Sequence, residues 1–248
     1  MNIAITTATQ IRHKYMVNLL DRHLGYALKV VVAQRSREPS ETDASAPQNK
    51  KHLFERLFEK IIKIVLFRPS SLHFRPKEKI VYVDSVNDDI VKRTLQERQI
   101  DLLIIFGGKI IKDEILAAVK YRAINIHNGY SPYYKGSYTI FFPIAEHTFD
   151  KVGTTIHWAI PQVDAGSIIL RHRFVPAFYL HPELLFIQSI KHSIASLIPL
   201  LGLLQKGYTL PQIDDPAPGR TYKGKEYTPE KKQAVKKILW RLFWRHRI

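Results

Sequence analysis

Three polar residues near the middle of the chain have the types and the spacing of a catalytic site. Asn125 and His127 lie two positions apart in an alternating apolar segment that begins at Ile124, so an extended strand carries both side chains on one face. Asp164 follows a β-branched segment at 154–160 and belongs to an Asp-Ala-Gly bend. The sequence therefore predicts that an amide, an imidazole and a carboxylate meet at strand ends.

These three side chains suit a reaction in which negative charge develops on an oxygen atom. The amide of Asn125 offers fixed N–H donors and does not titrate, as oxyanion stabilisation requires. The imidazole of His127 can donate a hydrogen bond or relay a proton near neutral pH, and Asp164 would orient it and favour its cationic form. Taken singly, each feature also has a structural explanation, because Asn-x-His pairs occur in ordinary strands and Asp is common in turns.

The segments around these residues predict a mostly parallel α/β sheet. Residues 2–6 and 30–32 are short apolar strands with a helix-like segment between them, over 9–23. Residues 80–83 form the next strand, and 101–106 form a continuous apolar strand of the kind that is covered on both faces. Asn125 and His127 then lie at the carboxyl end of a following strand, where open α/β sheets bind their ligands.

Helices of different character are added to this sheet. Residues 35–50 are polar and rich in Pro and Ser, which predicts a mobile loop. The helix predicted at 51–67 carries an apolar stripe on one face and charges on the other, as an inserted amphipathic helix would. A second basic amphipathic helix is predicted at 229–246, and further helices at 137–146 and 182–205.

Composition indicates which kind of binding partner and which cellular compartment to expect. The 248 residues include 38 Lys and Arg but 22 Asp and Glu, a formal net charge of +16, which favours an anionic partner such as a phosphorylated substrate, a nucleic acid or a membrane surface. The absence of Cys excludes disulfides and thiolate catalysis and fits a reducing compartment. Because the N-terminus lacks the pattern of a signal peptide, we expect a cytoplasmic location, which includes the inner face of the membrane.

Four motifs in the middle of the chain resemble the catalytic half of the 10-formyltetrahydrofolate-dependent formyltransferases, a family that includes the sugar N-formyltransferases. They are Asn125-Ile-His127, Ser131-Pro132-Tyr-Tyr-Lys-Gly136, Gly153-Thr-Thr155-Ile-His157 and Asp164-Ala-Gly166. The resemblance is strong over 101–174 and concerns only topology before that. It implies a Rossmann-like α/β formyltransferase fold with added basic helices. We divide the chain into a catalytic domain, 1–208, with 35–78 inserted, and a C-terminal extension, 209–248.

The resemblance also implies roles for the three polar residues. Asn125 and His127 would hold and polarise the formyl oxygen while a substrate amine attacks. Asp164 would tune His127 and help to take the proton of the amine. The transfer would be direct, without a covalent enzyme intermediate and without a metal, and His157 would support the site from behind.

The same resemblance implies a folate site, with 10-formyltetrahydrofolate as the co-substrate. Its expected contacts come from the end of the strand at 101–106 and from the loop before the catalytic Asp. They are Phe106, Gly107, Lys109, Ile111, Gln162 and Val163. Gly residues let main-chain amides approach a flat pterin, although Gly107-Gly108 is equally compatible with a tight turn from strand to helix.

Departures from the family pattern point to the acceptor. The turn at Thr7-Ala8 lacks the Gly-rich phosphate loop of the purine enzyme, and 209–248 offers too few residues for the β-barrel domain of the tRNA enzyme, so a nucleic-acid partner is not expected. The loop 128–132 resembles that of sugar N-formyltransferases. We therefore expect a primary amine on an amino sugar that is linked to a nucleotide or a lipid.

Five residues are candidates for binding this acceptor. Arg12, His13 and Lys14 follow the first strand, near a helix start that could bind a phosphate, and Tyr130 and Lys135 belong to the loop after His127. A solvated basic surface is the alternative explanation for the first three.

The two basic helices, 51–67 and 229–246, have two explanations that the sequence leaves open. They can attach the chain to an anionic membrane surface, or each can cover the core or a homodimer partner. Two rival functions also remain: hydrolysis of 10-formyltetrahydrofolate, with water in place of the amine, and a catalytically silent homologue that docks at membranes.

Overall fold

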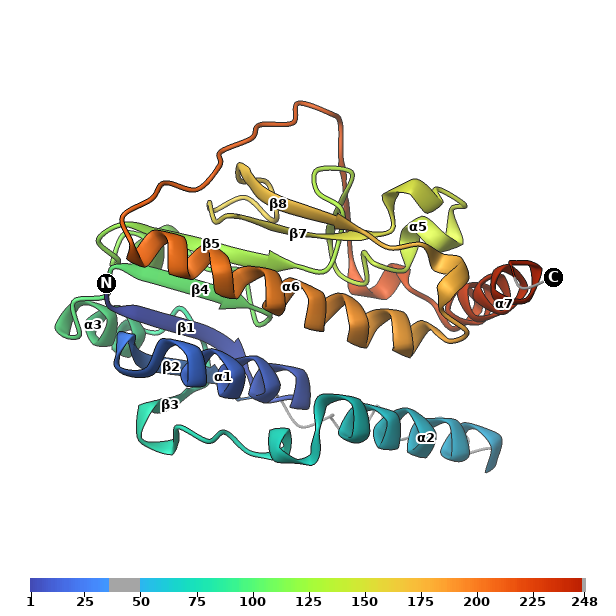
Figure 1. The fold of residues 1–248 in the computed structure, drawn as a ribbon, viewed down its shortest axis with the longest axis horizontal. Helices are drawn as coiled ribbons and strands as arrows, with labels where there is room; N and C mark the ends of the chain where they lie inside the picture. Colours follow the sequence, from blue (N-terminus) through green and yellow to red (C-terminus); the bar gives the residue numbers. More distant parts are fainter. Residues whose placement is uncertain (36–49, 247–248) are drawn as a thin grey trace.

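The fold is built on a seven-stranded sheet, seen in the computed structural model of the chain, which describes residues 1–35 and 50–246 (Figure 1). The strand order is β3-β2-β1-β4-β5-β7-β8, and β1 to β5 are parallel while β7 and β8 run antiparallel to their neighbours. The strands are β1 (Ile3–Ala8), β2 (Leu28–Gln34), β3 (Ile80–Val83), β4 (Leu102–Phe106), β5 (Arg122–His127), β7 (Gly153–Trp158) and β8 (Ile168–Arg173). The predicted α/β class with a mostly parallel sheet is confirmed.

A small second sheet and seven α-helices make up the rest of the regular α and β structure in the described residues. Strands β6 (Tyr134–Gly136) and β9 (Arg220–Tyr222) pair in parallel, although 83 residues lie between them in the sequence. The helices are α1 (Ile11–Leu24), α2 (Lys50–Phe67), α3 (Asp89–Glu97), α4 (Asp113–Leu116), α5 (Phe142–Ala145), α6 (Pro182–Gln205) and α7 (Pro229–Arg245). The loop predicted at 35–50 lies outside the described residues except at its two ends.

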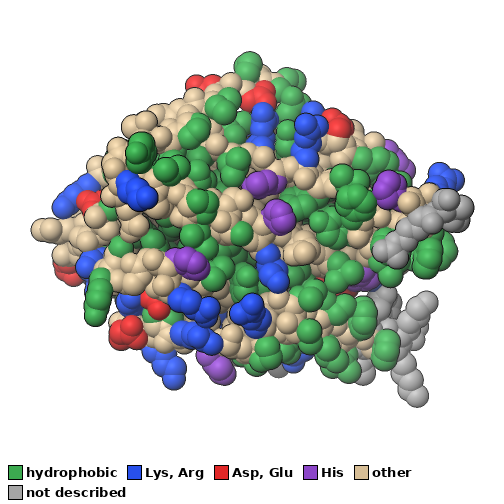
Figure 2. Space-filling model, in the orientation of Figure 1, with side chains coloured by type: hydrophobic (Ala, Val, Ile, Leu, Met, Phe, Trp, Pro, Cys, Tyr) green, Lys and Arg blue, Asp and Glu red, His purple; other side chains and the backbone are tan. Residues whose placement is uncertain are grey.

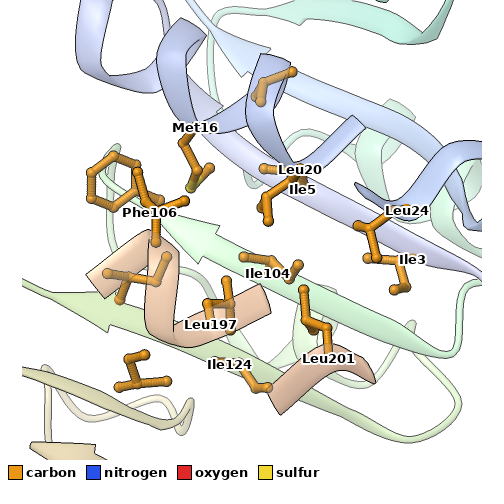
Figure 3. Packing of buried hydrophobic residues seen from close by; sticks show 14 of the residues in the cluster. Ile3, Ile5, Met16, Leu20, Leu24, Ile104, Phe106, Ile124, Leu197 and Leu201 are labelled. Carbon is orange, nitrogen blue, oxygen red and sulfur yellow. The ribbon is translucent and has the colours of Figure 1, made fainter. Parts of the chain in front are cut away.

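Alternation along the central strands divides the core between the two faces of the sheet. In β1, Ile3 and Ile5 pack on one face with Met16 and Leu20 of α1, whereas Ala4 packs on the other face, among residues of α3 and α4 (Figure 3). Both faces of the central strands are therefore buried, as their continuous apolar sequences predict. Each fully buried Leu or Ile contributes about 1.5–3 kcal/mol relative to an exposed one.

Helix α6 is long and apolar because it crosses the larger of these two core layers. It is the one helix among the described residues with the length and composition to cross a membrane, and 44% of its most apolar window is buried inside the molecule. Leu197 and Leu201 pack against the sheet next to Ile124 (Figure 3). Pro199 lies within the helix without ending it, and α6 has the bounds predicted for it.

One predicted helix is much shorter than expected. The sequence predicts a helix over 137–146, but the structure has only α5, of four residues. Gly136 and Tyr138 both have positive φ, at 95° and 58°, so the backbone before α5 turns instead of coiling. Phe142 is buried, and it stacks on Tyr222 of β9.

Helices α2 and α7 meet at the end of the molecule toward which the parallel strands point (Figure 1). Glu59 of α2 forms ion pairs with two residues of α7, at 3.3 Å from Lys232 and 3.9 Å from Lys236. The last segment of the chain therefore lies beside the inserted helix, and both lie at the carboxyl edge of the sheet, where a doubly wound sheet binds its ligands.

Candidate active site

Asn125, His127 and Asp164 meet as the sequence predicts. Strand β5 ends at His127, and its alternation directs both of its polar side chains to the same side. Asp164 comes from the turn between β7 and β8, and its carboxylate lies between the two. The Asn125 amide donates to Asp164 Oδ1 at 2.9 Å, and His127 Nδ1 lies 3.1 Å from Asp164 Oδ2.

Backbone geometry holds Asp164 in this position. Its φ is +47°, a left-handed conformation that Asp tolerates better than most residues. The backbone N–H of Gly136 donates to Oδ2 at 2.9 Å, so the carboxylate is fixed from the β6 side as well. Burial alone would raise the pKa of Asp164, but His127, His157 and the Gly136 N–H together lower it to about 2.

His127 is buried with both ring nitrogens facing acceptors. Nε2 lies 2.8 Å from the carbonyl of Tyr134 and 3.3 Å from the hydroxyl of Thr139, and Nδ1 faces the Asp164 carboxylate. Burial lowers the pKa of His127, and the raising effects of Asp164 and the Tyr134 carbonyl do not offset it. Asp164 favours the cationic form of His127 as expected, but desolvation outweighs the carboxylate and the net direction of the pKa is downward.

His157 sets the position of Asn125. Its Nδ1 lies 2.8 Å from the carbonyl of Trp158, which makes Nδ1 the donor and leaves Nε2 as an acceptor. Asn125 Nδ2 lies 3.0 Å from that Nε2, while the same amide group donates to Asp164. Both amide hydrogens of Asn125 are thus bonded inside the cluster, so a substrate oxygen has to compete for one of them.

The cluster lines a cavity of about 1500 Å³. Every residue of the expected folate site lines it too: Phe106, Gly107, Lys109, Ile111, Gln162 and Val163. Gly107 and Gly108 have φ of +71° and +97°. They form a tight turn after β4, and the same two residues line the cavity. A Cβ on Gly107 would lie 2.8 Å from His13 Nε2. Gly107 is therefore favoured by its positive φ and by the close approach of His13.

Two of the five expected acceptor residues line this cavity. The Arg12 guanidinium lies 5.6 Å from the centre of the Phe186 ring. Burial lowers the pKa of Arg12 to about 10, against the raising effects of Glu183 and Tyr138. His13 is buried edge-on to Phe106, and its pKa lies well below the ordinary value because of burial and the charge of Arg12.

The other three expected acceptor residues lie away from the cavity. Lys14 Nζ donates to the carbonyl of Leu72, since the turn of α1 directs it toward the segment at 69–74. The Tyr130 ring lies against the cations Arg171 and Lys151 instead.

The side chain of Lys135 points away from the cavity because of the geometry of strand β6. It alternates with Tyr134, which is buried, so its side chain points to the opposite side of β6, toward Gly219. Local sequence places these residues near the site but does not fix the direction of their side chains.

Charged residues of three helices line the cavity and were not among the expected site residues. Glu183, at the start of α6, lies 3.4 Å from Lys63 of α2, and burial raises the pKa of Glu183. Glu59, Lys232 and Lys236 form the ion pairs between α2 and α7 described above. Their signal in the sequence is the charged face of each amphipathic helix, but nothing local indicates that these faces turn inward.

A known enzyme family shares part of this sequence. A segment of 83 residues is 32% identical to a methionyl-tRNA formyltransferase of Sulfurihydrogenibium sp., and it covers 33% of this chain and 26% of that protein. The chain thus matches about a quarter of the length of this curated relative.

The whole fold is similar to solved structures at low sequence identity. A sugar N-formyltransferase from Shewanella sp. has a TM-score of 0.62 at 15% identity, over 96% of this chain and 88% of that chain. An N-formyltransferase from Helicobacter canadensis, in complex with folinic acid and dTDP-3-aminofucose, has a TM-score of 0.61 at 14% identity, over 97% of this chain and 80% of that chain. At these identities the likeness shows the fold.

Membership of a family follows from the match over the site itself. The family model described as formyl transferase matches residues 13–177, which is more than half of the chain and contains Asn125, His127 and Asp164. This chain belongs to the formyl transferase family.

Proposed function

We propose that the chain transfers a formyl group from 10-formyltetrahydrofolate to the primary amine of an amino sugar linked to a nucleotide or a lipid. The observation that carries the proposal is the Asn125–His127–Asp164 cluster in the wall of a cavity that the expected folate residues also line. The fold neighbour with folinic acid and dTDP-3-aminofucose supports both the one-carbon donor and the class of acceptor.

The volume of the cavity suits a reaction between two sizeable molecules. Pockets for a single small ligand measure about 300–1,000 Å³. The cavity here is about 1500 Å³ and extends from Gly107 at the carboxyl end of β4 to Lys236 of α7. Folate at the β4 end and an acceptor near Arg12, Lys63 and α7 would fill it, with the reacting atoms between them at the cluster.

The chemistry assigned to the cluster is acyl transfer. The amine nitrogen attacks the formyl carbon, the bond from that carbon to N10 of the folate breaks, and one proton passes from the amine to N10. Asp164, whose pKa lies at about 2, is ionised near neutral pH and can accept the amine's proton on its way. Asn125 and His127 supply donors for the oxygen, which requires them to exchange the bonds they make in the cluster; such bonds often rearrange when substrate binds.

Mass spectrometry tests the proposal directly. Purified chain is incubated with 10-formyltetrahydrofolate and a panel of amino sugars linked to nucleotides or to lipid phosphates. The expected result is a formyl mass increment on at least one acceptor. Formate released at the same rate without any acceptor would instead favour hydrolysis, and absence of both products together with absence of folate binding would contradict an enzymatic role.

A further inference from the structure

Helix α2 packs Ile62, Leu66 and Phe67 against the core and leaves a second set of apolar side chains facing outward. Glu59 and Lys63, on its charged face, line the cavity and pair with α7 and α6. Five large apolar side chains on its other face are between 46% and 72% exposed. These residues, here named the α2 stripe, are Phe54, Leu57, Phe58, Ile61 and Val65.

Exposure of the α2 stripe to water is unfavourable. A surface helix buries its apolar face against the core and exposes its charged face. Contiguous apolar surface of this kind on a soluble protein marks an interaction site. Hydrophobic side chains gather at the lower right of Figure 2, at the end of the molecule where Figure 1 places α2.

Two exposed tryptophans lie on the neighbouring helix α7. Trp240 and Trp244 are about half exposed, and their rings lie 6.4 Å apart. Trp240 lies one turn beyond Lys236, the residue whose ion pair with Glu59 joins α7 to α2. The α2 stripe and the two tryptophans therefore lie on neighbouring helices at the same end of the molecule (Figure 1).

Charge decides what kind of partner fits the surface. Lys60 on α2 and Lys237, Arg241 and Arg245 on α7 are exposed beside the apolar side chains. A second copy of the chain would bring an equally basic surface against this one, within a molecule of net charge +16, and the two would repel. An anionic bilayer satisfies both requirements, because its headgroups pair with the cations while its acyl boundary takes up the apolar side chains.

We propose that the α2 stripe, with Trp240 and Trp244, is a docking surface for an anionic lipid bilayer. The helices lie in the interface plane, with tryptophan at the headgroup level where its amphipathic ring is favoured. The charged faces of the same helices line the cavity. Docking therefore brings the cavity beside the bilayer without using any residue assigned to formyl transfer.

Vesicle flotation tests the docking surface. The probe is vesicles made of equal parts phosphatidylglycerol and phosphatidylcholine, with pure phosphatidylcholine as the comparison. The chain is expected to float with the anionic vesicles, and the double variant Phe54→Gln/Ile61→Gln to bind about tenfold more weakly or worse, as loss of about 1.4 kcal/mol or more of apolar transfer would produce. Both residues are exposed, so the variant is expected to keep the fold.

The matched control removes two exposed aromatic side chains elsewhere. Tyr26→Gln/Tyr208→Gln changes residues just after the ends of α1 and α6, at the opposite edge of the sheet, and vesicle binding is expected to stay at the wild-type level. Equal binding by the wild type and the α2 double variant, or no binding to anionic vesicles, overturns the proposal. If the wild type is a dimer in solution and the α2 double variant a monomer, with no vesicle binding by either, a second copy is the occupant.

Tryptophan fluorescence gives an independent readout. Trp158 is buried, so a blue shift of the emission on adding anionic vesicles reports Trp240 and Trp244. Salt is expected to reduce the shift by screening the cations. A shift that persists in Trp240→Phe/Trp244→Phe would contradict docking through α7. Formyl transfer to a soluble acceptor should be equal in the wild type and the α2 double variant, which separates failure of docking from failure of the proposed function.

Discussion

At the scale of single residues, the cluster is a set of buried groups whose protonation is tied together. Asp164 accepts from Asn125 and from the Gly136 backbone and faces His127, while His127 also faces the Tyr134 carbonyl. The residue types at 125, 127 and 164 predicted the meeting of these groups. The role of the Tyr134 carbonyl was not predictable, because it depends on how the loop after β5 folds back on its own strand.

The lowered pKa of Asp164 predicts a dependence of stability on pH. A carboxyl whose pKa falls from 3.8 to about 2 on folding contributes stability above its unfolded pKa and loses it as the pH falls through its folded pKa. The contribution is about 2 kcal/mol and is lost between about pH 4 and pH 2. Urea unfolding of the wild type and of Asp164→Asn over this window measures it. The variant should show a shallower slope, and parallel curves would contradict the assignment.

At the scale of elements, sequence periodicity was a good guide to the sheet and to the long helices. The strands around 30–32, 80–83 and 101–106 and the helix at 182–205 are all present. The pairing of β6 with β9 was not predicted, because strands of three residues carry no periodicity and their partner lies far along the chain. The charged faces of α2 and α7 point into the cavity for a similar reason. The residues that they contact lie far away in the sequence, so no local pattern predicts this orientation.

Gly136 shows how such a short element supports the site. It has φ of +95°, its N–H holds Asp164, and a Cβ there would collide with the backbone carbonyl of Tyr222 in β9. Gly136→Ala is therefore expected to destabilise the chain by about 1–3 kcal/mol and to lower activity. Thermal unfolding and initial rates check both effects.

Gly202 provides the matched control for this substitution. It lies in α6, where an added Cβ meets nothing within 4 Å, so Gly202→Ala should be stabilising by about 0.5–1 kcal/mol. If both variants change stability by the same amount, the strain assigned to Gly136 is wrong.

At the scale of the whole molecule, the cavity joins residues from nearly the full length of the chain. Arg12, the cluster on β5, Lys63 of α2 and Lys232 of α7 all line it. The two basic helices are thus part of the cavity wall as well as carriers of the exposed apolar surface. Their charged faces carry the cations that the proposed phosphorylated acceptor would contact.

Lys232→Gln is expected to raise KM for a phosphate-bearing acceptor about tenfold with little change in kcat, since it removes a cation from the acceptor end of the cavity. Steady-state kinetics with a soluble acceptor measures the two constants separately. Lys237→Gln, an exposed position on the same helix, should leave both unchanged. A fall in kcat with constant KM for Lys232→Gln would contradict this placement of the acceptor.

The central claim is that Asp164, with Asn125 and His127, performs formyl transfer, and a single-turnover rate tests it most directly. The comparison is between the wild type and Asp164→Asn, in which the new side chain has nearly the same size. Each enzyme is mixed, in excess over its substrates, with 10-formyltetrahydrofolate and the acceptor that mass spectrometry identifies. The substitution Asp164→Asn is expected to reduce the rate about 10²-fold or more, with folate still bound. Transfer by Asp164→Asn at the wild-type rate would contradict it.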